Sequence, residues 1–435
     1  MRDLVLFIAV FGLLPFILRN AYVGVLAWSW LSYMNPHRLT WGPAYDFPFA
    51  QLVALTLFAS LVFNREKKHF PVNGLIIVWL MFLLWTVVST YFAYYPDAAW
   101  GYFPQVIKIQ LIIFISLWMM GSPERIKLMV WVIFLSIGFF GIKGGIFTIK
   151  TAGGGRIFGP AGSFIADNNH LAVAMLMVLP LGFYLRKHEV TRKLYKNLIT
   201  VSLLLITLAI IASYSRGAFL AITAVAIYLW WKTPSKVITG VLGSVVLATF
   251  VVFMPDAWMD RMASITEYDQ DKSALGRLNA WGYAVNIASD RITGGGYQSW
   301  SVETFQQWAE SSASVAVAHS IYFAVLADHG WVGLLLFLLV FTMGWRMAGR
   351  LVKFTARSKH EDAAWIGDLA KMIRVSFVAY AVGGAFLSLA YFDLPWHLLG
   401  IVVLLDQLAR QREIIPQRAG ARHPVPATVR NTPPA

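Results

Sequence analysis

Long apolar segments recur along this chain, and they constrain its fold more than any other feature. A helix that crosses the hydrocarbon core of a bilayer needs about 20 mainly apolar residues. Segments of this kind lie at 47–64, 72–91, 103–120, 126–147, 168–186, 196–213, 217–231, 236–254, 319–344, 372–391 and 395–409. We therefore predict an all-α, polytopic integral membrane protein.

The composition supports this prediction and excludes several other classes of protein. Of the 435 residues, 58% are hydrophobic and 13% are charged, against about 45–50% and about 25% in soluble proteins. An ordinary cytosolic enzyme, a disordered protein and a fibrous repeat are excluded. The chain has no cysteine, which excludes disulfides, a thiolate metal site and a cysteine nucleophile.

The number of spans depends on residues 4–34. They contain two apolar runs separated by Leu18-Arg19-Asn20. One broken crossing gives about 12 spans and a cytoplasmic N-terminus, whereas two short crossings give 13 spans and an external N-terminus. The run that follows Met1-Arg2-Asp3 lacks a clear cleavage site, so we interpret it as membrane segment and not as a removed signal peptide.

The orientation follows from charge, because every second loop is basic. The loops 64–71, 121–127, 186–197, 231–236 and 345–371 and the tail from 406 hold 23 Lys or Arg and 8 acids, whereas the alternate loops hold 9 and 12. The positive-inside rule places the basic set, with the C-terminus, in the cytoplasm. The formal net charge of +14 thus reports orientation and contact with anionic membrane lipids, and no nucleic-acid partner is expected.

The longest external segment is 255–318, and it is predicted to be an ordered periplasmic loop. It contains Trp258, Trp281, Trp300 and Trp308, and its residues 278–289 predict a helix on the membrane face. We divide the chain into N-terminal membrane helices (1–167), a core that carries this loop (168–410) and a disordered cytoplasmic tail (411–435).

A tight external turn, Ser213-Tyr214-Ser215-Arg216-Gly217-Ala218, is the first candidate for chemistry. A lone Arg at this depth can be an interfacial side chain that reaches toward water. However, serine hydroxyls, backbone N–H groups and a helix N-terminus beside Arg216 form a donor set that suits an anion such as phosphate. Both interpretations stay open on the sequence alone.

Two further arginines flank the helix expected around Trp281. Arg277 has no adjacent acid, so a structural role and a second anion contact are equally compatible with its spacing. Arg291 follows Asp290, and a surface ion pair is its simpler interpretation, although we include it among the substrate-binding candidates.

His319 begins the span at which the long loop re-enters the membrane. A histidine at a helix start is commonly a satisfied hydrogen-bonding residue, but a neutral imidazole at the interface is also a suitable general base near pH 7. Tyr322 and Leu326 share its helix face. Asp328, nine residues on, lies about 180° away, so it cannot pair directly with His319, and we expect it to pair with a basic group of a neighbouring helix.

Other patterns carry less information. Asp269-Gln270-Asp271 matches the Asp-x-Asp of metal-dependent sugar transfer, but its charged surroundings are equally typical of a solvated loop. Gly153–Gly155 and Gly294–Gly296 lack the lysine and strand–helix context of a phosphate-binding loop. No His-Glu-x-x-His or Gly-x-Ser-x-Gly motif occurs, which disfavours intramembrane proteolysis.

Three motifs in this order resemble the O-antigen ligase/polymerase superfamily: Ser213–Ala218, Gly276–Trp281, and Ala318-His319-Ser320-Ile321-Tyr322-Phe323 with its continuation to Gly333. The segment Arg156–Phe164 with Asp167-Asn168-Asn169-His170 is similar to the exosortase-associated O-glycosylation ligases. The resemblance covers roughly residues 1–410.

This resemblance implies a glycosyltransferase of GT-C-like architecture in the bacterial inner membrane, with its active site open to the periplasm. Such an enzyme transfers a glycan from undecaprenyl pyrophosphate to lipid A-core or protein, with no metal or other cofactor. The family's essential histidine falls on His319, and its essential arginines fall on Arg216 and Arg277. Substrate-binding roles are expected for Arg156, Asn169, Ser215, Trp281, Arg291 and Tyr322. Many relatives have Glu where this chain has Asp328.

The residue chemistry agrees with that function and leaves alternatives. Arginines can stabilise the charge on a departing pyrophosphate, and His319 can deprotonate the acceptor hydroxyl, which predicts inversion at the anomeric carbon. A polymerase would use another lipid-linked repeat as acceptor. A transporter for the same glycan would need charged residues at mid-membrane and internal repeats, and a scaffold protein would not need His319.

Overall fold

A computed structural model of the chain describes residues 1–63, 70–238, 240, 241, 243 and 272–416. Within these residues all regular structure is helical. The predicted span 236–254 lies largely outside them. The Asp269-Gln270-Asp271 motif, Trp258 and the tail beyond residue 416 also lie outside the described residues.

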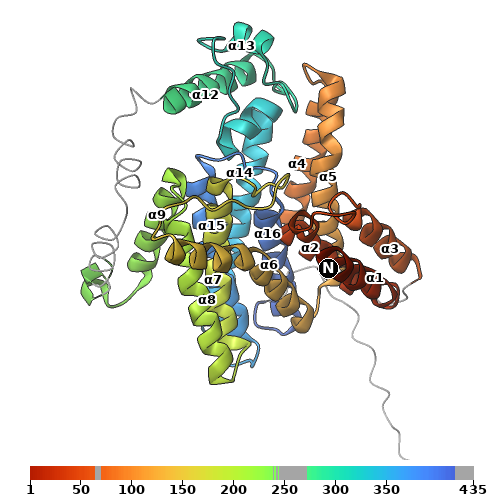
Figure 1. The fold of residues 1–435 in the computed structure, drawn as a ribbon, viewed down its shortest axis with the longest axis vertical. Helices are drawn as coiled ribbons and strands as arrows, with labels where there is room; N and C mark the ends of the chain where they lie inside the picture. The colour runs from red at the N-terminus through yellow and green to blue at the C-terminus, as the bar shows by residue number, and fades with distance from the viewer. Residues whose placement is uncertain (64–69, 239, 242, 244–271, 417–435) are drawn as a thin grey trace, which may run out of the picture.

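Among the described residues most helices are joined by short connections, and the longer ones are 151–167 and 309–320 (Figure 1). In chain order they are α1 (Arg2–Arg19), α2 (Ala21–Met34), the 3-10 turn η1 (Pro36–Leu39), α3 (Phe49–Phe63), α4 (Gly74–Tyr91), α5 (Pro96–Met119), α6 (Pro123–Lys150), α7 (Asn168–His188), α8 (Lys193–Ile211), α9 (Arg216–Lys232), α12 (Lys272–Asp290), α13 (Val302–Trp308), α14 (Ile321–Thr355), α15 (Ala363–Gly384) and α16 (Asp393–Gln411).

Each predicted apolar segment in the described residues overlaps one helix, although the bounds differ: the segment 372–391 corresponds to α15, which ends at Gly384. Six of these helices are long and apolar enough to cross a membrane: α4, α5, α6, α7, α8 and α14. The shorter α3 is also apolar. The all-helical membrane fold is confirmed at this level, whereas the total of about 12 spans and the periplasmic placement of the loop stay predictions.

Residues 4–34 form two helices that run antiparallel. The break falls at Asn20, which has an extended backbone. The carboxylate of Asp3, at the start of α1, accepts a hydrogen bond from the backbone of Ala44, beyond the end of α2. Ser60, near the end of α3, in turn bonds the carbonyl of Leu18. Helices α1, α2 and α3 therefore alternate in direction.

Side-chain caps fix the starts of several helices. Asn73, Ser122, Asp167 and Ser215 each accept a hydrogen bond from a backbone N–H of the first turn of α4, α6, α7 and α9, respectively. Such a cap satisfies a donor that has no partner inside the helix. Two of these capped starts, those of α7 and α9, lie at the candidate site.

Helix α14 is broken at Gly330, where φ is 67° and ψ is −172°. The break frees backbone carbonyls that an intact helix would use. Gly295 and Gly296 donate their N–H groups to the carbonyls of Ala327 and Asp328, at 2.7 and 3.0 Å, and the Trp85 indole donates to the carbonyl of His329 at 2.8 Å. The triple-glycine loop therefore fills the break and satisfies its polar groups, as a membrane requires.

The fit at this break excludes larger residues. A Cβ at Gly294 would lie 2.5 Å from the carbonyl oxygen of Ala327, and one at Gly330 would lie 2.3 Å from that of Ile292. Glycine is thus required here by close backbone approach as well as by positive φ. The segment between α12 and α13 is held against α14 and α4.

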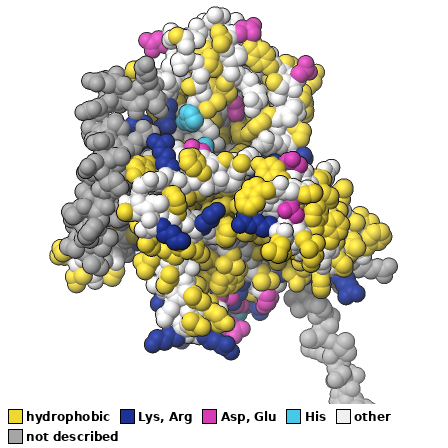
Figure 2. Space-filling view, viewed as in Figure 1, with side chains coloured by type: hydrophobic (Ala, Val, Ile, Leu, Met, Phe, Trp, Pro, Cys, Tyr) yellow, Lys and Arg dark blue, Asp and Glu magenta, His cyan; other side chains and the backbone are white. Residues whose placement is uncertain are grey.

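One end of the bundle collects the basic loops. Ion pairs join Lys127 to Glu189, Lys187 to Asp368, and Arg412 to Asp362. They bring together the loops 121–127, 186–197 and 345–371 and the end of α16, all assigned to the cytoplasm from their charge. Figure 2 shows dark-blue Lys and Arg side chains at this lower end, below α7 and α8.

Candidate active site

The opposite end of the bundle carries the turn between α8 and α9. Tyr214 adopts a left-handed backbone, with φ at 58°, and its hydroxyl donates to the carbonyl of Gly153 at 2.8 Å. The Ser215 hydroxyl accepts from the N–H of Ala218 and caps α9, which places Arg216 as the first helical residue. Ser215 thus shapes the turn, and Arg216 is half-buried within it.

The start of α7 packs beside this turn. The side-chain amide of Asn168 donates to the carbonyl of Ser213 at 2.7 Å, and both residues are buried. Asp167 therefore lies next to the turn, and Asn169 donates to its carboxylate from both the backbone and the side chain, each at 2.8 Å. Asn169, predicted to bind substrate, orients Asp167 in this structure.

His319 directly precedes the first turn of α14 and has a strained backbone, with φ at 44°. A non-glycine residue in the left-handed region persists only where its surroundings fix it, and such residues concentrate at functional sites. The indole of Trp281 on α12 supplies one such restraint, because it donates to the carbonyl of Ala318 at 2.8 Å. The same indole stacks on Phe323, with ring centroids 4.7 Å apart.

Helix α12 also holds the loop before His319. The side chain of Asn279 both donates to the carbonyl of Ser311, at 2.8 Å, and accepts from its N–H, at 3.1 Å. Arg277 lies on the same helix, one turn before Trp281, and is half-buried. The three segments that carry Arg216, Arg277 and His319 therefore meet at one end of the bundle.

The pKa of His319 lies below its ordinary value for two physical reasons. Burial is the larger, since it penalises the charged imidazolium, and the cationic side chain of Arg277 is the second. The carboxylate of Asp167 acts in the opposite sense and raises this pKa. His319 is consequently neutral at pH 7 and able to accept a proton.

Asp167 is the carboxylate within electrostatic reach of His319. Burial alone would raise its pKa, but the hydrogen bonds from Asn169 outweigh this effect and lower the pKa overall. His170 interacts electrostatically with both residues, and its Nδ1 lies 3.8 Å from Asp167. Nothing in the sequence pairs Asp167 with His319, because the two residues are far apart in the chain and approach each other only in the fold.

Two buried polar atoms next to His319 have no hydrogen-bond partner among the described residues. They are the hydroxyl of Ser320 and Nε2 of His170. Buried polar groups are rarely left unpaired, and an unpaired group needs an explanation. Neither residue was predicted to act in the site, although Ser320 follows His319 directly in the motif.

An apolar cavity of about 340 Å³ begins beside this site and runs between α14 and α15. Tyr322 lines it, and its hydroxyl donates to the carbonyl of Ala381 on α15 at 2.8 Å. Phe341, Trp345 and Phe377 line it further along the helices. Figure 2 shows a histidine and several basic side chains at the hollow beneath α12 and α13.

Arg156 is exposed in the connection between α6 and α7. Its segment is tied to the turn before α9 through the bond from Tyr214 to Gly153. Arg156 therefore belongs to the same end of the molecule, although no bonded contact of its side chain in the described structure links it to His319.

The structure corrects two expectations about ionisable residues. Arg291 does not pair with Asp290: its guanidinium donates to the carbonyls of Gly294, at 3.0 Å, and Phe92, at 2.6 Å. Among the described residues Asp328 has no basic partner: it accepts from the hydroxyl of Tyr391 at 2.8 Å. Both residues hold the helix break together, so Arg291 is positioned as a structural tie.

Within the described residues, no three His, Asp or Glu side chains gather to hold a metal ion. The Asp269-Gln270-Asp271 motif lies outside these residues, so the prediction of a metal-independent site remains to be tested by experiment.

Comparison with known families adds two matches. Residues 1–190 match a family of unknown function, DUF5935, and residues 201–338 match the O-antigen ligase family. No curated protein matches the chain. The second match contains Arg216, Arg277 and His319, together with the segments that converge around them. The match over residues 201–338 supports the resemblance of this part of the chain to the O-antigen ligase superfamily.

Proposed function

We propose that this protein is a glycan ligase of the bacterial inner membrane. It transfers an oligo- or polysaccharide from undecaprenyl pyrophosphate to an acceptor hydroxyl, on lipid A-core or protein, at the periplasmic face. The observation that carries the proposal is the convergence of Arg216, Arg277 and His319 at one end of the bundle, inside the segment that matches the ligase family.

In this proposal the two arginines bind the pyrophosphate. When the bond between the anomeric carbon and the pyrophosphate oxygen breaks, negative charge develops on the leaving group. Guanidinium groups held in a half-buried site stabilise that charge more strongly than they would in water. The N-terminus of α9, with Arg216 as its first residue, adds the positive end of a helix dipole.

His319 is the proposed general base. Its lowered pKa keeps the imidazole neutral, so that it can take the proton of the acceptor hydroxyl as the hydroxyl oxygen attacks the anomeric carbon. The new glycosidic bond forms as undecaprenyl pyrophosphate departs from the opposite face, which inverts the anomeric configuration. Asp167 is a positioning residue that favours the imidazolium formed in this step.

The cavity between α14 and α15 is the proposed path of the polyprenyl chain. It is lined mainly by apolar and aromatic side chains, and it begins at Ile321 and Tyr322, two and three residues from His319. A lipid that lies in it would present its pyrophosphate at the site end. The Trp281 side of the site is then left for the acceptor.

The test is a transfer assay with purified protein, an undecaprenyl-linked glycan and separate candidate acceptors, followed by anomeric analysis of the product. We expect one glycan per acceptor, inverted configuration and full activity in chelator. Chains that grow by repeated units, without transfer to lipid A-core or protein, would identify a polymerase. Loss of activity in chelator, restored by Mg²⁺ or Mn²⁺, would overturn the metal-independent mechanism and direct attention to Asp269 and Asp271.

A further inference from the structure

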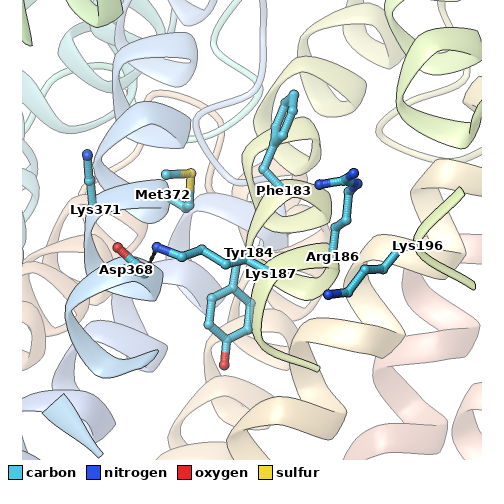
Figure 3. A pocket seen from close by; sticks show the side chains of 8 residues that line it. All are labelled: Phe183, Tyr184, Arg186, Lys187, Lys196, Asp368, Lys371 and Met372. Atoms are coloured by element: carbon cyan, nitrogen blue, oxygen red, sulfur yellow. Dashed lines mark hydrogen bonds and ion pairs between the residues drawn. The ribbon is translucent and has the colours of Figure 1, made fainter. Parts of the chain in front are cut away.

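A second cavity, of about 400 Å³, lies at the basic end of the bundle, far from His319 along the helices. It is formed by the end of α7, the start of α8 and the first half of α15 (Figure 3). Its lining residues are Phe183, Tyr184, Arg186, Lys187, Lys196, Asp368, Lys371 and Met372. Four cations thus surround one carboxylate.

The single carboxylate is already hydrogen-bonded to two of its neighbours, one of which is the cation Lys187. Asp368 accepts from Lys187 at 2.6 Å and from His188 at 2.7 Å. Figure 3 shows Lys187 extending from α7 across to Asp368 on α15. The positive charges of Arg186, Lys196 and Lys371 therefore remain around the cavity, and like charges so placed repel one another unless an anion joins them.

Arg186 is oriented for such an anion. Its Nε donates to the hydroxyl of Thr200 on α8 at 2.7 Å. Within the described structure its two Nη groups have no protein acceptor, and a guanidinium offers these paired donors to two phosphate oxygens at once. Lys196 extends from α8 toward the same side of α7 in Figure 3.

The apolar part of the lining distinguishes a lipid from a soluble anion. Phe183 precedes Arg186 by three residues on α7, and Met372 follows Asp368 by four on α15, which runs in the opposite direction. Phe183 is thus about one helical turn, roughly 5 Å, deeper in the bundle than Arg186, and Met372 about one turn deeper than Asp368. Phe183 is 54% exposed, so an apolar surface continues from the cationic cavity along the outside of α7.

We propose that this cavity binds the headgroup of an anionic glycerophospholipid. The phosphodiester would lie between Arg186 and Lys196, while Lys371, on the α15 side of the Lys187–Asp368 pair in Figure 3, adds positive charge to the cavity. The acyl chains would lie along Phe183 and Met372. A zwitterionic headgroup is disfavoured, because its ammonium would enter a cavity that already has excess positive charge. Basic pockets between membrane helices commonly recognise lipid phosphates in this way.

The test uses the full-length protein purified in detergent and loaded with an equimolar mixture of phosphatidylglycerol and phosphatidylcholine, with bound lipid counted by native mass spectrometry. We expect preferential retention of phosphatidylglycerol, reduced by roughly tenfold or more in the variant Arg186→Gln/Lys196→Gln/Lys371→Gln. The matched control is Lys353→Gln/Arg357→Gln/Lys359→Gln, which removes three exposed charges at the same end but outside the cavity.

Three outcomes would overturn the proposal. They are equal loss of phosphatidylglycerol in both triple variants, equal retention of the two lipids by the wild type, and displacement of the lipid by inorganic phosphate or glycerol phosphate at matched concentration. The last would identify a site for soluble phosphate. Thermal unfolding of each variant, without added lipid, separates lost binding from lost folding.

Discussion

The two ends of the helix bundle use charge in opposite ways. At the basic end, carboxylates are shared between basic side chains that are partly exposed: Asp368 binds both Lys187, whose side chain is 67% exposed, and His188. At the site end Arg216, Arg277 and His319 are half-buried, and two of the turns beside them are strained, with positive φ at Tyr214 and His319. Exposed pairs contribute little stability each, whereas buried charges shift one another's pKa. The number of charges therefore indicates orientation, and their burial indicates chemistry.

The comparison is tested most strongly by replacing one histidine at each end. His319→Ala should reduce glycan transfer by about 10²–10⁴-fold, because the general base is lost. His360→Ala, at the basic end, should leave transfer within about twofold of wild type. Both are measured as initial rates with purified, folded protein. Wild-type transfer by His319→Ala would remove His319 from the mechanism.

Replacing an arginine should likewise lower the transfer rate at the site end and not at the basic end. Arg216→Ala and Arg277→Ala should each lower kcat by about 10²-fold, since each removes a donor to the developing charge. Lysine at either position should restore part of the rate, because it keeps the charge without the paired donors. Arg357→Ala, exposed at the basic end, serves as the control, and an equal loss there would contradict a specific role.

Substitution at the helix break should lower the stability of the protein more than substitution at a glycine that no neighbouring atom approaches. Gly330→Ala should destabilise the protein by about 3 kcal/mol. The positive φ of residue 330 is unfavourable for Ala, and a Cβ there would overlap the carbonyl of Ile292. Gly101→Ala, where a Cβ meets nothing within 4 Å, should be neutral or slightly stabilising. Thermal unfolding in detergent compares the two, and similar midpoints would show that the break tolerates a side chain.

The smallest effect expected is a shift in the pH dependence of transfer. Activity should fall as the pH drops through the pKa of His319, because the imidazolium cannot accept a proton. Arg277→Gln removes a cation that lowers this pKa, so the acidic limb should move to higher pH. Asp167→Asn removes an anion that raises it, so the limb should move to lower pH.

Profiles of kcat/KM against pH measure these shifts on the residual activity of each variant, and each should be less than about one unit. Arg357→Gln should leave the profile in place. If the acidic limbs of Arg277→Gln and Asp167→Asn moved in the same direction, His319 would not be the titrating group.

The sequence predicted the helices well because hydropathy is a local property. The segment 72–91 became α4, Gly74–Tyr91, almost residue for residue. Charged helix ends were less well predicted: α15 begins at Ala363, nine residues before the apolar run, because Asp368 and Lys371 lie within it at the surface. Apolarity marks the buried length of a helix and not its full extent.

The site was predictable only in part, because a sequence reveals features of neighbouring residues but not contacts between distant segments. Arg216, Ser215 and His319 stand at helix starts next to turns, which the sequence reveals. The roles of Asp167, as a neighbour of His319, and of Arg291, as a donor to two carbonyls, depend on segments distant in the chain. The same is true of Gly294–Gly296, whose purpose became clear only beside the break at Gly330.

The glycine loop at that break has a consequence for exchanging parts between relatives. Because Gly295 bonds both the carbonyl of Ala327 and, through its own carbonyl, the N–H of Tyr94, the loop is in register with α14 and with the connection between α4 and α5 at once. A graft of the segment 291–300 alone would transfer the loop without the residues that form its hydrogen bonds. Chimaeras should therefore exchange this loop together with 89–94 and 327–330, as one interlocking unit.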